Sequence, residues 1–175
     1  KFSKYAIRNL SLYLVICYGF GYLIQTLNVS FLSYLTLDPI MILQGQIWRL
    51  VTWVLIPPDS LDLFTIIMLL FYYSVGSSLE RMWGTYRYNV YLFSGMLYTI
   101  IGSFLALLIY WLMARAAGTE VNPLVVQAAS GLFSTYYINM SIFLAFAMTY
   151  PEMQVYVFFI LPIKVKVLGI IYVII

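Results

Sequence analysis

Four long stretches without a charged residue decide what this chain can fold into. They comprise residues 9–37, 63–79, 88–114 and 121–151 of a 175-residue chain that is 64% apolar and 9% charged. An α-helix needs roughly 20 apolar residues to cross the hydrocarbon core of a bilayer, and each stretch is near or above that length. Soluble domains carry about a quarter charged residues, so a water-facing surface cannot be built from this composition. The sequence therefore predicts an all-α, polytopic transmembrane helical bundle rather than a β-barrel.

The basic residues predict how this bundle is oriented. Most of them fall on one side of the predicted helices: Lys1, Lys4, Arg8, Arg81, Arg87, Lys164 and Lys166. Arg49 and Arg115 fall on the other side. By the positive-inside rule the N-terminus is cytoplasmic, and we favour the bacterial cytoplasmic membrane over the endoplasmic reticulum. The basic residues form no continuous patch, so the expected partner is the lipid bilayer and not a nucleic acid.

The single cysteine, Cys17, lies inside the first apolar stretch. It has no second cysteine for an internal disulfide and no neighbouring ligands for a metal site. We expect it to pack, with palmitoylation as the alternative. No cofactor and no metal ion is expected.

Predicted helices span residues 5–27, 61–79, 86–113 and 132–150. Gly84 is expected to form a tight inner turn between the second and the third. The apolar segment 155–162 is expected to lie along the inner interface. A fifth helix begins near Lys164–Lys166 and has about ten residues, too few to span a bilayer. We therefore expect one domain over residues 1–175, truncated within helix five.

The first outer loop, residues 28–60, is too apolar to lie free in water. Pro39, Gly45, Pro57 and Pro58 divide it into short pieces. We expect it to be embedded partly in the outer membrane interface, where irregular backbone must find hydrogen-bond partners within the protein. Arg49 offers five donors in a fixed geometry and is the candidate to hold the carbonyl groups of this loop.

Small residues recur at helical spacing and predict the packing faces. Gly95 and Gly102 share one side of the third predicted helix, Ser141 and Ala145 share one side of the fourth, and Cys17 and Gly21 share one side of the first. Small residues at such positions allow the close backbone approach that holds membrane helices together.

Three motifs in order resemble the rhomboid superfamily. Residues 45–52, which contain Trp48 and Arg49, resemble its Gly-x-x-Trp-Arg-x-x-Thr segment. Residues 79–84 resemble its Leu-Glu-x-x-x-Gly signature through Glu80 and Gly84, with Arg81 and Trp83 between them. Residues 150–155, followed by 162–164, resemble the segment that leaves the fourth helix. The resemblance covers nearly the whole chain and implies a rhomboid-like fold.

The family contains active intramembrane serine proteases and inactive relatives such as derlins and iRhoms. The resemblance places the oxyanion-stabilising pair of active members at Phe64 and Met68, and their nucleophile near Tyr136. None of these side chains suits the chemistry that these positions serve in a protease. Three serines lie near the nucleophile position, namely Ser130, Ser134 and Ser141; each is expected to pack or to bond to its own helix. Glu80 is expected to be structural, by pairing with Arg81 or Arg87 or by accepting from turn amides.

The preferred hypothesis is a non-catalytic rhomboid-like protein, a pseudoprotease, that recognises transmembrane segments or partner membrane proteins. Histidine, the usual general base, is absent from the chain. In the family it would lie beyond residue 175, so a divergent intramembrane protease is the first alternative. A small membrane transporter subunit is the second; Arg49 is the nearest candidate for the intramembrane charge it would need.

Overall fold

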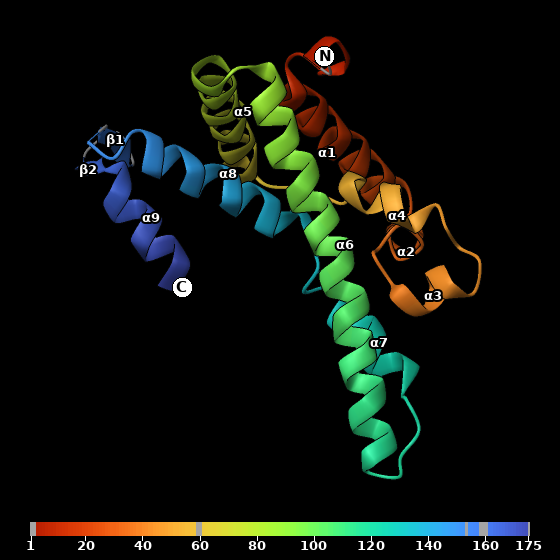
Figure 1. Ribbon diagram of the computed structural model, residues 1–175. Coiled ribbons are helices and arrows are strands. Elements are labelled where there is room, and N and C mark those ends of the chain that lie inside the picture. Colours follow the sequence, from red (N-terminus) through yellow and green to blue (C-terminus); the bar gives the residue numbers. More distant parts are fainter. Residues whose placement is uncertain (1–2, 59–60, 153, 158–160, 175) are drawn as a thin grey trace.

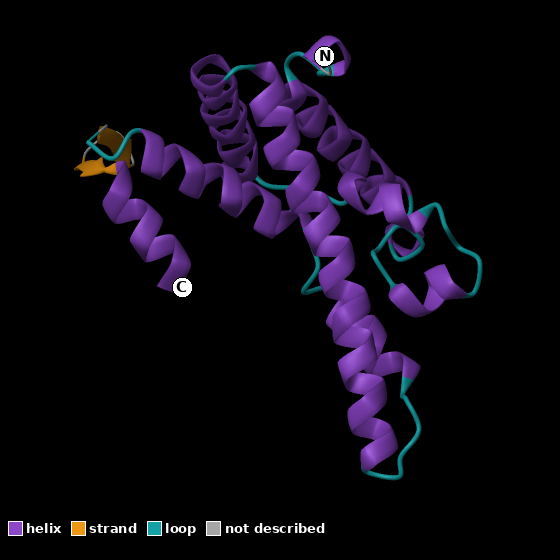
Figure 2. Ribbon diagram, viewed as in Figure 1, coloured by secondary structure: helices purple, strands orange, loops and turns teal. Residues whose placement is uncertain are grey.

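The computed structural model describes residues 3–58, 61–152, 154–157 and 161–174. It confirms a polytopic helical bundle, with four helical segments long and apolar enough to cross a membrane. Figure 2 shows one small pair of strands beside an otherwise helical chain. In chain order the elements are η1 (Ser3–Tyr5), α1 (Leu10–Leu27), α2 (Val29–Leu32), α3 (Pro39–Leu43), α4 (Arg49–Thr52), η2 (Trp53–Leu55), α5 (Leu63–Trp83), α6 (Thr85–Ala116), α7 (Pro123–Ser130), α8 (Thr135–Thr149), β1 (Gln154–Val157), β2 (Leu161–Lys164) and α9 (Val165–Ile174).

The N-terminal segment and the α5–α6 turn lie at one end of the bundle (Figure 1). The short helices α2–α4 and the far end of α6 lie toward the other end, and α8 runs across α5 and α6. The turn predicted at Gly84 is confirmed: its φ of 86° is a conformation that glycine adopts without strain. Helix α1 starts five residues later than predicted, because Asn9 adopts the left-handed conformation just before it, with φ 56°.

Short polar side chains cap the N-termini of several helices. The Asp38 carboxylate accepts from the amides of Ile40 and Met41 at the start of α3. Asp62 accepts from the Thr65 amide at 2.7 Å and from the Thr65 hydroxyl at 2.9 Å. These bonds cap α5 and lower the pKa of Asp62, because they favour the charged carboxylate.

The core is continuous from the first outer loop to the last long helix. Leu37, Ile42 and Trp53 of the loop are buried in the same cluster as residues from α1, α5, α6 and α8. Gly21 lets α1 approach the loop, because a Cβ there would collide with the backbone carbonyl of Leu55. The loop therefore packs as part of the bundle.

Two segments differ from the prediction. The chain before the fourth predicted helix forms a separate helix, α7, and α8 begins only at Thr135. Residues 154–157 and 161–164 form the antiparallel pair β1–β2, in which Gln154 is opposite Lys164, and the expected position of segment 155–162 along the inner interface stays a prediction. Glu152 bonds Lys164 at 2.5 Å and Lys166 at 3.1 Å, and these contacts lower its pKa. They join the start of the hairpin to α9.

Candidate functional site

Arg49 is the centre of the first outer loop. Its side chain is 4% exposed, and its Nε donates to Oε1 of Gln46 at 2.7 Å. One terminal nitrogen donates to the carbonyl of Ser33 at 2.8 Å, and to the carbonyl and hydroxyl of Thr36 at 3.0 and 3.1 Å. This guanidinium thus joins the turn after α2 to the start of α4.

Burial affects the protonation equilibrium of the Arg49 side chain. It lowers the pKa of the guanidinium, while nearby Asp38 and Tyr34 act in the opposite direction. Asp38 is itself buried and holds the N-terminus of α3. Trp48, the neighbour of Arg49 in the motif, is exposed. The chemistry available here is binding of backbone carbonyls, because arginine stays protonated and does not act as a base.

A second cluster, the inner clasp, fastens the N-terminal segment to α5 and α6. Oε1 of buried Glu80 accepts from the amide of Asn9 at 3.0 Å. The side chain of Asn89 accepts from the Ile7 amide at 2.9 Å and donates to the Ile7 carbonyl at 2.8 Å. Glu80 thus accepts from a backbone amide, and among the described residues it forms no ion pair with Arg81 or Arg87.

The inner clasp continues into the helices. The hydroxyls of Ser11 and Tyr88 lie 2.6 Å apart, and Gly76 of α5 fits beneath them. Arg81 is exposed and donates from Nε to the carbonyl of Ser77. Trp83 meets Tyr91 edge to face, with the ring centroids 5.4 Å apart.

A third cluster, the buried polar cluster, ties α8 to α1 and to the loop before α5. The amide nitrogen of Asn139 lies 3.1 Å from the hydroxyl of Tyr18 and donates to the carbonyl of Thr135. The Thr135 hydroxyl donates to the carbonyl of Ile56 at 2.7 Å. All three side chains are buried. Sequence reasoning missed this cluster and Asn89, although a lone asparagine within an apolar helix is a signal for such a contact.

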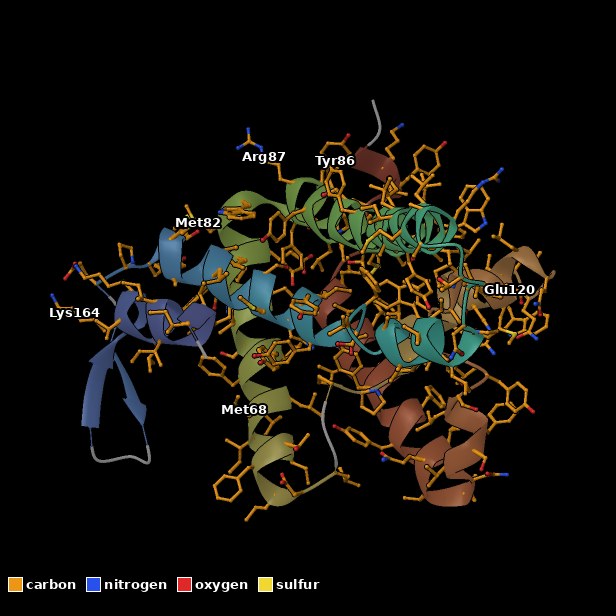
Figure 3. The ribbon with its side chains drawn as sticks, turned by 90° about the horizontal axis from the view of Figure 1, so that it is seen from below. Met68, Met82, Tyr86, Arg87, Glu120 and Lys164 are labelled. Carbon is orange, nitrogen blue, oxygen red and sulfur yellow. The ribbon has the colours of Figure 1, made fainter. Side chains whose placement is uncertain are left out.

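The positions that the resemblance assigns to catalysis do not form a polar site. Phe64 is 65% exposed and Met68 is 48% exposed, and both are apolar side chains on α5; Met68 is labelled in Figure 3. The hydroxyl of Ser130 donates to the carbonyl of Gln127 at 2.6 Å, and that of Ser141 to Ile138 at 2.8 Å. These two hydroxyls are engaged by their own chain segments.

The predicted packing residues differ in what they touch. A Cβ at Gly95 would meet open space among the described residues, so the close helix contact expected there stays a prediction. A Cβ at Gly102 would lie 3.5 Å from the ring of Phe133. Ala145 is buried in the core, and the carbonyl of Ser141 accepts from the hydroxyl of Tyr91 at 2.9 Å. Close approach occurs at Gly21 of α1, as predicted, and at Gly76 of α5, which was not predicted; in both cases the facing atoms belong to other segments.

Residues 8–175 match the sequence model of a family described as "Eukaryotic integral membrane protein (DUF1751)". No curated protein and no solved structure matches the chain. The family is eukaryotic, so the prediction of a bacterial cytoplasmic membrane was wrong. The physical reason is that the distribution of basic residues reports on which side of a membrane each loop lies, and positive loops face the cytoplasm in both kinds of cell.

Proposed function

The chain belongs to the family of eukaryotic integral membrane proteins (DUF1751), and on that premise we propose that it is a rhomboid-like pseudoprotease. In this proposal it recognises transmembrane segments of other membrane proteins and does not cleave them. The N-terminus faces the cytoplasm, as the basic residues indicate.

The observation that carries the non-catalytic part is the state of the would-be catalytic positions. A serine protease needs a nucleophile beside a base, together with donors aimed at the developing oxyanion. Phe64 and Met68 have no polar hydrogen to donate, and their side chains are largely exposed. The hydroxyls of Ser130 and Ser141 already donate to carbonyl oxygens of their own chain segments.

A fluorophosphonate probe tests this part directly, because it labels only serines that are activated as nucleophiles. We expect the protein in its native membrane to remain unlabelled while an active serine hydrolase in the same sample is labelled. Ser130→Ala, Ser134→Ala and Ser141→Ala are the informative variants, with Ser78→Ala on α5 as the matched control. Labelling that one of the three variants abolishes, and the control retains, would show an active protease.

The recognition part is supported by the surface of α6. Only 11% of its most apolar 18-residue window is buried, against 33–44% in the other three spans. Leu105, Leu108 and Leu112 all lie exposed on this helix. Between membrane helices the attraction comes from packing, so a long uncovered helix offers the area that a second helix needs.

A photo-crosslinking amino acid tests the recognition face. Placed at Leu108 of α6, it is expected to capture a restricted set of membrane proteins through their transmembrane segments. Phe20, an exposed residue of α1, is the matched control position. If both positions capture the same proteins in the same proportion, the contacts are collisions and α6 is not a recognition surface.

A further inference from the structure

We propose that the protein binds the phosphate group of an anionic phospholipid at the cytoplasmic end of the bundle. The site comprises two adjoining hollows beside the α5–α6 turn, with cavity volumes of about 410 and 610 Å³. Both hollows are lined by Arg8, Gly84 and Thr85. We call them together the headgroup site.

The headgroup site contains more positive than negative charge. Arg87 lines the smaller hollow, Arg81 the larger one and Arg8 both, while Glu80 is the one acidic residue among the lining residues. Among the described residues, none of the three arginines forms an ion pair. Arg81 uses only Nε, toward the Ser77 carbonyl, so its terminal nitrogens are available. Guanidinium groups bind phosphate oxygens in pairs, a geometry that lysine cannot supply.

The backbone adds donors at the same place. Helix α6 has 32 residues and starts directly after Gly84, which has no side chain to cap it. The first N–H groups of a helix have no partner within it, and the helix dipole favours an anion there. Gly84, Thr85, Tyr86 and Arg87, which form this first turn, all line the smaller hollow.

A buried hydroxyl in the wall of the larger hollow is a separate observation that points to a ligand. Ser77 is half-buried and lines the larger hollow, and its hydroxyl oxygen is buried without a hydrogen-bond partner among the described residues. Buried polar atoms are nearly always satisfied in folded proteins. A phosphate oxygen in the hollow would give this hydroxyl an acceptor after a rotation about its side-chain bond.

The position favours a lipid over a soluble phosphate compound. Trp83, Tyr73 and Tyr86 surround the hollows, and aromatic side chains of this kind gather at the level of lipid headgroups. Figure 3 shows Arg87 projecting away from the helices at the start of α6, with Tyr86 beside it. The anionic lipids of a cytoplasmic leaflet lie where such arginines reach them.

Binding of short-chain lipids to the purified full chain in detergent, followed by thermophoresis, tests the proposal. We expect dioctanoyl phosphatidic acid to bind, and dioctanoyl phosphatidylcholine to bind at least tenfold more weakly. The variant Arg8→Gln/Arg87→Gln should weaken the phosphatidic acid affinity at least tenfold. Arg115→Gln, an exposed arginine at the far end of α6, is the matched control and should leave it unchanged.

Further measurements distinguish a lipid phosphate from a soluble one. They also separate loss of binding from misfolding of a variant. Inorganic phosphate and glycerol 3-phosphate should compete only weakly; if they bind as tightly as the lipid, the lipid assignment is overturned. Equal affinity for the two lipids, or an equal loss in Arg115→Gln, would overturn the site itself. The unmodified protein gives an independent readout, because its affinity should fall at least fivefold between low and high salt.

Discussion

At the residue scale, Arg49 shows why one side chain can hold a loop of about thirty residues. Its donors reach four oxygen atoms on Gln46, Ser33 and Thr36, which lie on both sides of α3. A lysine has three donors on a single nitrogen and cannot cover this spread of acceptors. The loop therefore depends on the planar shape of arginine as well as on its charge.

Replacing Arg49 by lysine should lower stability. Hydrogen bonds to charged groups contribute about 1.5–3 kcal/mol each, so we expect a loss of about 2 kcal/mol or more. Arg115→Lys is the matched control: Arg115 lies 5.2 Å from the Trp111 ring centroid, and a lysine can keep that contact. Thermal unfolding in detergent measures both. Equal melting temperatures for the two variants would contradict the role given to Arg49.

The kind of contact that Arg49 makes could be predicted from the sequence, but its partners could not. A buried arginine in a broken, apolar loop must find carbonyl groups, and this follows from chemistry alone. Ser33 and Thr36 become those partners because the loop folds back on itself and brings them to Arg49, 16 and 13 residues further along the chain. Asn89 and Asn139 were missed for a related reason: their hydrogen-bond partners lie 82 residues away in one case and on a different helix in the other.

At the scale of elements, the contacts of glycine decide how closely two helices approach. A side chain at Gly76 would meet the hydroxyls of Ser11 and Tyr88, so α1, α5 and α6 come together at this point. Spacing along one helix could not reveal this, because the facing atoms come from two other helices. The same limit explains why a Cβ at Gly95, which has suitable spacing, would have no described atom of another segment within 4 Å.

Alanine substitutions at these two glycines should have opposite effects. Gly76→Ala is expected to destabilise the protein by roughly 1–3 kcal/mol, because the buried hydroxyl pair must move apart. Gly95→Ala should be neutral or stabilise by up to about 1 kcal/mol, because alanine favours a helix and the space is open. Thermal unfolding of both variants decides the matter. A destabilised Gly95→Ala would show that this face is covered in the membrane.

The long helices could be predicted from the lengths of the apolar stretches, while the short elements could not. Asn122-Pro123 carries the signal of a helix start, with the Asn122 side chain accepting from the Leu124 amide, yet α7 is too short to be recognised as a span. The residues of β1 and β2 include β-branched and aromatic types that favour strands. Their pairing depends on contacts between two separate segments, which hydropathy does not specify.

At the scale of the whole molecule, α6 determines which parts lie on opposite sides of the membrane. It contains 32 residues, which at 1.5 Å per residue is a length of about 48 Å, more than the roughly 30 Å hydrocarbon core. Tyr86 in its first turn and Glu120 beyond its last turn are both exposed. These two residues therefore report on the two aqueous phases.

Single-cysteine variants test this arrangement in sealed microsomes. Cys17 is replaced by serine, and cysteine is placed at Tyr86 or at Glu120. With the N-terminus cytoplasmic, an impermeant maleimide should label Tyr86→Cys in intact vesicles, and Glu120→Cys only after the membrane is opened with detergent. The reverse pattern would invert the orientation. Labelling of both variants in intact vesicles would show that α6 does not span the membrane.

The hydrogen bonds of the first helix join it to residues made much later. Asn9 bonds Glu80, which is 71 residues further along the chain. Ser11 bonds Tyr88 at a separation of 77 residues, and Tyr18 bonds Asn139 at a separation of 121 residues. At about 5–20 residues per second, a ribosome needs about 6–24 s to make the last of these intervals. Until Asn139 is made, Tyr18 of α1 lacks this partner, while Glu80 and Tyr88 become available to Asn9 and Ser11 earlier. Quality-control factors therefore have most time to act on the nascent chain before α8 is synthesised. Delays in translation ahead of Asn139 lengthen that period.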